Sequence, residues 1–250
     1  MGTEVSVNTF AVSDVKDLEI RIAAADVRTK EAAGEEIRVE AKNLRDGRYT
    51  CEQNGGKLVV AHEIEGIGNF HRWNDETQIV LYLPEGMRLD SIVLEIGAGE
   101  VRMDAGSISC SDMDVEIGAG KWKAANLSVS GELNVKIGAG KAKMKRVTAG
   151  SVNIECGVGS SVYKGRIGGD IRVGCGVGSC SFQLENKEGD FNYDVSCAMG
   201  SVTINNNKIR SFASRKRYKS ETALGTAVLE CGLGSIEMPP EVIEIDLSNT

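Results

Sequence analysis

The sequence predicts an all-β protein, specifically a parallel β-solenoid (β-helix-like) with coils of about 19–21 residues. The first observation is a four-residue phrase, Ile-Gly-Ala-Gly or Cys-Gly-Val-Gly, that recurs at 96–99, 117–120, 137–140, 156–159 and 175–178. The second is the spacing of successive copies, 19 to 21 residues, which falls within the coil lengths of solenoids. The third is that apolar and polar residues alternate before each phrase, as they do in a strand with one buried side.

Each repeat is numbered here from its Ile or Cys as position 0. Positions −2, 0 and +2 are apolar, which predicts that all three side chains point inward. The next apolar residues are at +5 and +7, and this change of parity predicts a corner of the coil at the glycines of positions +1 and +3, where no Cβ would contact the neighbouring coil. The residues at +2 are Ala98, Ala119, Ala139, Val158, Val177, Met199 and Leu233.

Glycines six residues before position 0 predict a second corner of the coil. These glycines are Gly131, Gly150 and Gly169.

Further copies extend the repeat in both directions. Degenerate phrases occur at 197–200 and 231–234, and the segment 22–28 matches 96–102 far downstream. Parallel pairing of successive coils would stack like side chains at about 4.8 Å. Helical repeats are disfavoured, because each phrase holds two glycines, each destabilising a helix by about 1 kcal/mol, and no period of 3.6 residues is present.

Residues 1–90 are expected to form strands and hairpins continuous with the stack. Short apolar alternations predict strands near residues 10–12, 18–22, 37–41 and 77–83. Asn54-Gly55-Gly56 lies between two further strand patterns, which is a strong signal for a hairpin. Antiparallel hairpins here would cover the edges of the first coil.

Residues 91–238 hold the solenoid repeats, with one insertion at 205–228 where the spacing between phrases grows. After Pro239-Pro240, residues 239–250 are predicted to contain a charged capping strand at 241–247. No apolar run is long enough to span a membrane, and the first residues do not resemble a signal peptide. The net charge of −7 argues against general affinity for nucleic acid.

The seven cysteines cannot all pair within the chain. Cys156, Cys175, Cys197 and Cys231 occupy position 0, so they are expected to point inward, to stay reduced and to have raised pKa values. No Cys-x-x-Cys spacing suggests zinc. No cofactor and no catalytic residue is therefore predicted.

Three chemistries compete with a purely structural interpretation of these motifs. The Gly-Ala-Gly-Lys segments at 118–121 and 138–141 lack the remaining residues of a phosphate-binding loop. Glu95 and Glu116 would lie roughly 5 Å apart on neighbouring coils, a separation that retaining glycosidases use. His62 and His71 flank acidic residues and could bind a metal, although a solvated polar loop explains them as well.

The insertion carries the strongest charge pattern in the chain. The segment contains six cationic residues and a single acidic one, Glu221. Its net charge is therefore +5, in a chain whose net charge is −7. A solvated loop is one explanation. The other is a loop that binds a polyanion such as an anionic wall polymer or a lipid surface. The candidate residues are Lys208, Arg210, Arg215, Lys216, Arg217 and Lys219.

The phrases Ile-Gly-Ala-Gly-Glu-Val-Arg-Met at 96–103 and Cys-Gly-Val-Gly-Ser at 156–160, preceded by residues 81–89, carry a family resemblance. Over residues 18–238 the chain resembles the bacterial putative-adhesin β-repeat family, a group of domains of unknown function. The resemblance implies a β-solenoid, often attached to the cell envelope, and no catalytic residues. If the chain is complete, the lack of a signal or anchor instead predicts a cytoplasmic protein.

Two functions follow as hypotheses. The first is a non-catalytic binding or scaffolding solenoid, adhesin-like and associated with the cell envelope, that contacts a protein, a glycan or a wall polymer. The alternative is a polysaccharide-active hydrolase that uses Glu95 and Glu116. The sequence leaves the oligomeric state open.

Overall fold

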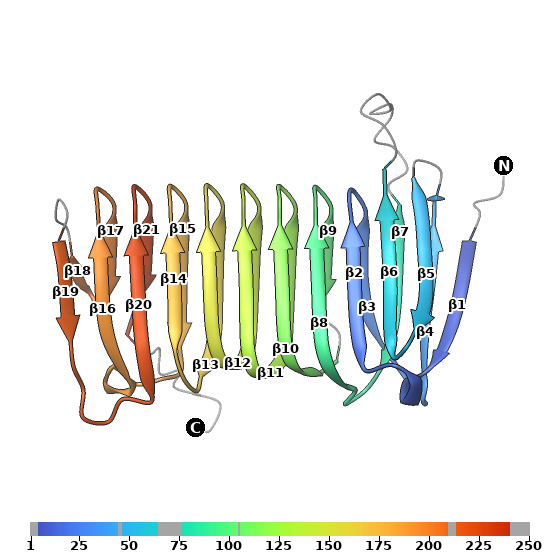
Figure 1. The fold of residues 1–250 in the computed structure, drawn as a ribbon, viewed down its shortest axis with the longest axis horizontal. Coiled ribbons are helices and arrows are strands. Elements are labelled where there is room, and N and C mark those ends of the chain that lie inside the picture. The colour runs from blue at the N-terminus through green and yellow to red at the C-terminus, as the bar shows by residue number, and fades with distance from the viewer. Residues whose placement is uncertain (1–4, 45–46, 65–76, 105, 210–213, 241–250) are drawn as a thin grey trace, which may run out of the picture.

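The computed structural model describes residues 5–44, 47–64, 77–104, 106–209 and 214–240, and within them the chain is all-β. The predicted fold class is thereby confirmed at its coarser level. Two layers of strands stand face to face, and in each copy of the repeat a tight turn joins a front strand to the back strand that follows it (Figure 1). We call a front strand and the next back strand along the chain a rung. The described part contains two short 3₁₀ segments, η1 (Val12–Asp14) and η3 (Glu188–Asp190), but no α-helix.

The front layer faces the viewer in Figure 1. Its strands, in spatial order, are β5 (Arg48–Asn54), β6 (Lys57–Glu63), β2 (Asp17–Ile22), β8 (Arg88–Ile96), β10 (Ile108–Ile117), the second parts of β11 (Lys121–Ile137) and β12 (Lys141–Cys156), β14 (Ile171–Cys175), β20 (Gly225–Cys231), β16 (Phe191–Cys197) and β19 (Ser214–Tyr218).

The back layer follows the same spatial course. Its strands are β1 (Val5–Ala11), β4 (Glu36–Lys42), β7 (Gln78–Pro84), β3 (Asp26–Ala32), β9 (Glu100–Met103), the first parts of β11 and β12, β13 (Ser160–Ile167), β15 (Ser179–Leu184), β21 (Ser235–Met238), β17 (Ser201–Ile204) and β18 (Asn207–Ile209).

Position 0 forms one continuous buried ladder along the stack. Ile22 pairs directly with Ile96, so the distant upstream copy lies beside the first copy of the main repeat. His62 occupies position 0 of the next rung outward and is 1% exposed. The ladder runs through His62, Ile22, Ile96, Ile117, Ile137, Cys156, Cys175, Cys231 and Cys197.

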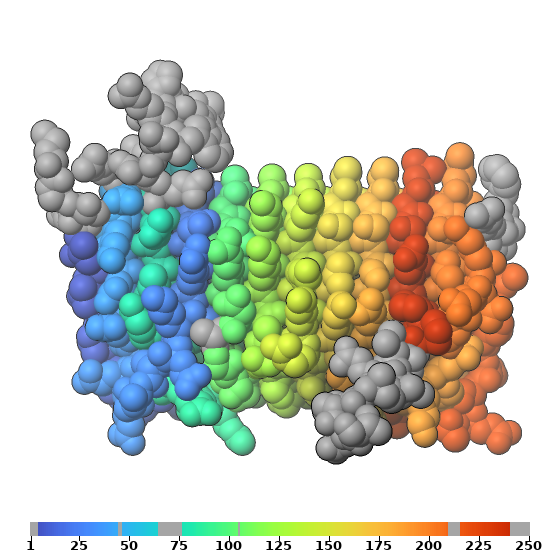
Figure 2. Space-filling model, turned by 180° about the vertical axis from the view of Figure 1, so that it is seen from behind, coloured from blue at the N-terminus to red at the C-terminus, as the bar shows by residue number. Residues whose placement is uncertain are grey.

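The spatial order of the rungs differs from the order in the chain at both ends. The rung β2–β3 lies between β6–β7 and β8–β9. The rung β20–β21, red in Figure 2, lies between β14–β15 and β16–β17. The sequence predicted that hairpins from residues 1–90 would lie outside the first coil, but it did not predict the exchange at the C-terminal end. Antiparallel strands β18 and β19 flank β17 and β16, so the last rung of the chain inserts inside the stack.

The predicted inward direction of position +2 is wrong. The chain turns directly after position 0, and +2 lies at the tip of the turn, where Val158 and Met199 are both 68% exposed. The turns are tied to one another, because the backbone N–H of each +2 residue donates to the carbonyl of +1 in the neighbouring rung, as from Val158 to Gly138 at 2.8 Å. The apolar character of +2 therefore produces an exposed ridge instead of a third buried position.

Between the back and front layers the chain turns twice, and the second of these turns falls at the predicted Gly131 and Gly150. Strands β11 and β12 run through both glycines with a register irregularity between Val129 and Glu132. Each strand also bends at a residue with positive φ, at Asn126 (55°) and Arg146 (52°). Short segments at 127–129, 147–149 and 165–167 thereby form a narrow lower face between the two layers.

Antiparallel strands cover the stack at its N-terminal end. Asn54 pairs with Lys57 across Gly55 and Gly56, whose φ angles are 58° and 90°, and this forms the hairpin β5–β6. In the back layer β4 pairs with both β1 and β7 in antiparallel register. At the other end, β17 and β18 form a hairpin around Asn205 and Asn206. The capping strand predicted at 241–247 lies outside the described residues.

All seven cysteines are free thiols, and the four at position 0 are 1 to 4% exposed. Burial raises the pKa of Cys231 to about 11. The expectation of a raised pKa is wrong for Cys156, because a hydrogen bond from the Cys180 thiol lowers its pKa to about 7 against the effect of burial.

We expect native Cys156, Cys175, Cys197 and Cys231 to react slowly with a maleimide, at rates set by local opening of the stack. Cys156 should react before Cys175 and Cys231 at pH 7, because its pKa is lowered and theirs are raised, which gives Cys156 the larger thiolate fraction. Mass spectrometry of protein quenched over time measures the order, and labelling in urea provides the fully reactive control. Immediate labelling of all four in the native protein would contradict their burial.

Candidate functional site

The C-terminal end of the stack is hollowed where the lower face stops. Asn186 closes that face, because its side chain accepts from the Ile167 N–H and donates to the Ile167 carbonyl, both at 2.9 Å. The side chain is thus a substitute for the next strand, and Asn186 is only 6% exposed. The chain then passes through η3 into β16, so among the described residues no segment like 165–167 lies beneath the following rungs.

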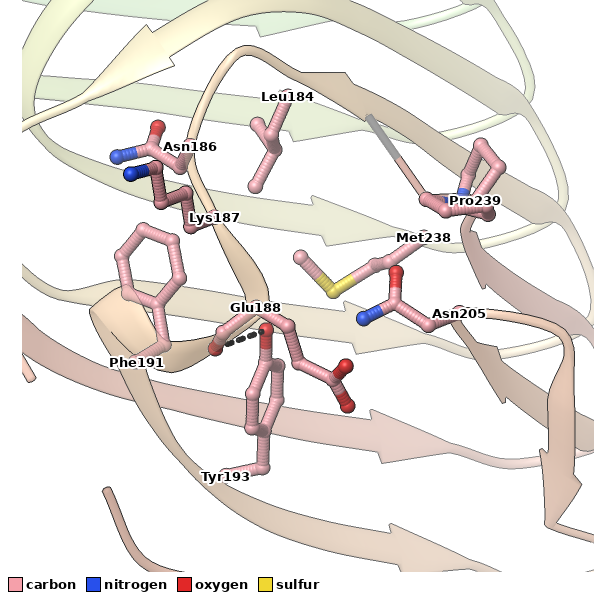
Figure 3. Close-up of a pocket in the computed structure, with 10 residues that line it drawn as sticks. Leu184, Asn186, Lys187, Glu188, Phe191, Tyr193, Asn205, Met238 and Pro239 are labelled. Atoms are coloured by element: carbon pink, nitrogen blue, oxygen red, sulfur yellow. Dashed lines mark hydrogen bonds between the residues drawn. The ribbon is translucent and has the colours of Figure 1, made fainter. Parts of the chain in front are cut away.

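Two adjoining cavities occupy this position, and together we call them the basic cleft. The smaller has a volume of about 250 Å³ and the larger about 800 Å³. Both are lined by Glu188, Phe191 and Tyr193. Figure 3 shows the two aromatic side chains on one side of the smaller cavity, with Met238 and Pro239 opposite them. The hydroxyl of Tyr193 donates to the backbone carbonyl of Glu188 at 3.4 Å, which holds η3 against β16.

The larger cavity extends to the two last strands of the stack. Ile204, Ile209 and Tyr218 continue its apolar wall. Lys208 on β18 and Lys216 on β19 contribute ammonium groups, and Lys219 follows directly after β19. The cleft therefore joins an aromatic and aliphatic wall to a cationic rim.

Electrostatically the cleft is unlike the rest of the chain. Its described lining contains four lysines, three in the larger cavity and Lys187 in the smaller one. The acidic residue of this lining is Glu188. Lys208, Lys216 and Lys219 are exposed and make no ion pair with another described residue. Solvated cations of this kind can bind an external anion without first breaking an internal pair.

The structure brings together half of the predicted anion-binding residues. Lys208, Lys216 and Lys219 line the basic cleft. Arg217 points to the other side of β19, where its Nε lies 3.2 Å from Oδ2 of Asp194. Arg210 lies outside the described residues; Arg215 belongs to β19, but its side chain is outside the described part. The insertion at 205–228 contains the edge strands β18 and β19, and is not a simple loop.

Sequence reasoning missed the apolar wall of the cleft. Phe191 and Tyr193 stand six and four residues before position 0 of their repeat. The corresponding residues of the paired rung are Gly225 and Ala227. No other copy has an aromatic residue at either position, and this was the signal that could have indicated a cavity.

The carboxylates of the alternative hypothesis lie on the outer face of the front layer. Glu95 and Glu116 are in-register neighbours and both are exposed. Arg21 pairs beside Glu95 and Lys136 beside Glu116, so a ladder of mixed charge surrounds them. A shallow depression of about 420 Å³ extends from Glu116 to Gly174, where the ladder has no side chain.

The histidines do not form a site together in the described structure. His62 is buried at position 0, and its Nε2 lies 3.4 Å from the hydroxyl of Thr77, so the interpretation of His62 as a solvated loop residue is wrong. His71 lies outside the described residues. Within the described ranges, no group of three or more His, Cys, Asp or Glu side chains could hold a metal ion.

A two-layer stack of in-register parallel rungs, with a cleft at one end, defines an all-β repeat protein. The chain belongs to the Toastrack DUF4097 family, a domain family of unknown function, whose model matches residues 15–223. No curated protein matches the chain. The described part of the chain has no helix with the length and apolar character that a membrane span requires.

Solved structures of bacterial proteins resemble the chain over nearly its whole length at low identity. One is a putative adhesin from Bacteroides fragilis, with 11% identity, a TM-score of 0.46, and coverage of 94% of this chain and 96% of that one. Another is a putative cell adhesion protein from Clostridium sporogenes, with 13% identity, a TM-score of 0.38, and coverage of 95% and 99%. A putative adhesin from Parabacteroides distasonis has 10% identity, a TM-score of 0.36, and coverage of 94% and 97%.

Proposed function

We propose that this protein is a non-catalytic, adhesin-like binding module of the cell envelope, built as a β-solenoid, and that its basic cleft binds an anionic wall polymer. The observation that carries the proposal is the convergence of Lys208, Lys216 and Lys219 on one cleft. Lys208 lies on β18 in the back layer, whereas Lys216 and Lys219 lie on or directly after β19 in the front layer, and both strands are at the end of the stack. Their convergence is therefore a product of the fold and not only of a charged segment of sequence.

The chemistry of the cleft suits a repeating anion. Lysine ammonium groups are flexible, strongly hydrated point charges that bind phosphate or carboxylate without demanding one geometry. A chain of −7 repels polyanions in general, so attraction must be local to such a cluster. Tyr218, which is 47% exposed beside the lysines, offers an apolar surface for the backbone of the polymer.

The rival hydrolase would need a different site. Glu95 and Glu116 lie on an exposed face whose in-register neighbours are charged side chains. General acid catalysis by a carboxyl group commonly depends on an apolar or like-charged environment that raises its pKa. Release of reducing ends from a wall polysaccharide, lost in Glu116→Gln, would support the hydrolase and contradict the non-catalytic proposal.

We expect binding of poly(glycerol phosphate) at about 0.1 M salt and much weaker binding at about 1 M salt, because the Debye length falls from about 10 Å to about 3 Å. The triple variant Lys208→Ser, Lys216→Ser, Lys219→Ser should bind at least about tenfold more weakly at the lower salt concentration, since each lost phosphate contact also removes counterion release. Isothermal titration calorimetry measures both effects.

A matched control separates the cleft from net charge. Lys121, Lys141 and Lys143 are exposed on the back layer, and changing these three to serine alters the charge equally. This control variant should bind nearly as well as the wild type. Equal weakening in both variants would show that only net charge matters, and absence of binding by the wild type would refute the proposed ligand.

A further inference from the structure

We propose that the N-terminal end of the stack is a twofold interface with a second copy of this chain. In the dimer, β1 would pair with β1 in antiparallel register. The back layer of strands would then continue from one copy into the other. This inference rests on the N-terminal end alone and is independent of the proposed polymer binding.

Both N-terminal edge strands are long and regular. β1 pairs with β4 and β5 with β6, each over seven residues without a register shift, and neither has a second described partner strand. The outer backbone groups of such strands are ready to pair with another chain. Native proteins usually protect an edge of this kind with charges, prolines, bulges or shortness.

β1 has none of these protective features. Its residues, Val-Ser-Val-Asn-Thr-Phe-Ala, include no charged residue and no proline. Val5 and Val7 are 46% and 56% exposed on this strand. The opposite end of the stack differs, because β18 has only three residues, including Lys208, and β19 carries Lys216 and Arg217. The two ends of the same rod are thus unequally protected against strand pairing.

The interior is also incompletely covered at the N-terminal end. Phe10, Leu44, Tyr49 and Cys51 are only partly buried, although they pack against the core. They lie on or beside the edge strands β1 and β5. A partner placed against this end would cover apolar side chains as well as satisfy backbone groups, which is the combination that stabilises protein interfaces.

Charge and symmetry favour a second copy as that partner. A twofold axis perpendicular to the layers reverses every strand and keeps each layer on its own side, so β1 of one copy can pair in antiparallel register with β1 of the other. At this end the back layer extends one strand, β1, beyond the front layer, so the pairing involves the back layer. β1 carries no charge, and β5 carries one cation and one anion, Arg48 and Glu52. Two identical ends therefore meet without net repulsion, whereas two basic C-terminal ends would repel each other.

Sedimentation velocity of the full 250-residue chain across a range of concentrations tests this inference. We expect a reversible dimer in the wild type and a monomer in the double variant Val5→Lys, Val7→Lys, because like charges opposed across an antiparallel pair are destabilising. Both side chains are exposed, so this variant should retain the far-UV spectrum of the wild type. Small-angle scattering of the wild-type dimer should show about twice the maximum dimension of the monomeric variant.

A control with the same substitutions elsewhere makes the result specific. Val158 and Val177 are 68% and 57% exposed on the ridge of turns. The variant Val158→Lys, Val177→Lys should remain dimeric. A monomeric wild type at every concentration, a dimeric β1 variant, a monomeric ridge variant, or a dimer no longer than the monomer would each overturn the inference. Polymer binding is measured separately, so its failure and the failure of the dimer are distinguishable.

Discussion

Gly178→Ala is expected to lower the free energy of unfolding by about 3 kcal/mol, because a Cβ at this position meets backbone that cannot move aside. The added carbon would overlap the Gly159 carbonyl oxygen and would lie 2.9 Å from the Cys156 sulfur. That carbonyl already accepts a hydrogen bond from the Ser179 N–H at 3.1 Å. Relief of the overlap would therefore require separation of two rungs that hydrogen bonds hold together.

Other glycines of the stack provide graded controls for this experiment. An alanine Cβ at Gly174 would have no atom within 4 Å, so Gly174→Ala should be neutral or stabilise the fold by up to about 1 kcal/mol. Gly118, at position +1, is intermediate, since its Cβ would lie 3.1 Å from the Gly97 oxygen. Urea denaturation ranks the three variants. Equal stability of Gly178→Ala and Gly174→Ala would refute the close approach of the turns.

Trp122→Ala is expected to destabilise the protein by about 3–5 kcal/mol, the range for removal of a buried aromatic side chain. Trp122 is 0% exposed and lies on the inner side of β11. Its in-register neighbours are Val101 and Ala142, so the indole ring fills space that a small residue on the next rung leaves. Rigid rungs on both sides prevent the cavity from collapsing.

Trp122→Phe separates the volume of the ring from its polar atom. The indole Nε1 is buried without a hydrogen-bond partner in the described structure, so its removal relieves an unsatisfied donor while leaving a smaller cavity. We therefore expect a loss clearly smaller than that of the alanine variant. Urea denaturation followed by far-UV circular dichroism measures both. A loss below about 1 kcal/mol in Trp122→Ala would contradict tight packing at this point.

The repeat phrase predicts the register of the stack because identical side chains favour identical positions. Ile22 and Ile96 are 74 residues apart in the chain, yet their matching contexts indicated that both belong to the repeat, and the structure pairs them directly. The direction of position +2 could not be predicted in the same way. An apolar residue between two glycines fits a strand and the tip of a turn equally well, and hydrogen bonds between turns, not burial, decide the geometry.

The repeat pattern also could not predict the spatial order of the rungs at the two ends of the stack. The copies with Cys197 and Cys231 at position 0 have equivalent phrases, so by sequence either copy could pair with the rung of Cys175. The structure places Cys231 there, because β18 and β19 already cover the outer side of the preceding rung. Which copy pairs with the rung of Cys175 depends on which strand edges remain unpaired in the folded protein. The spacing of motifs along the sequence carries no information about that.

The candidate site was predictable in its charges and not in its shape. The run of cations from Lys208 to Lys219 indicated an anion-binding segment. The cleft itself arises because Asn186 ends the lower face before the rungs β20–β21 and β16–β17, and the second of these carries Phe191 and Tyr193. A hydrogen bond from a side chain to a distant backbone group leaves no periodic signature in a sequence.

The insertion of β20–β21 inside the stack gives the protein a mechanical property. A pull on the chain beyond Met238 acts on β21, which has hydrogen-bonded neighbours in β15 and β17. The force is then shared by two ladders loaded in shear, whereas a strand at an open edge would peel away one bond after another. For a module that held a polymer under flow, the rung that bears the tension would be clamped on both sides.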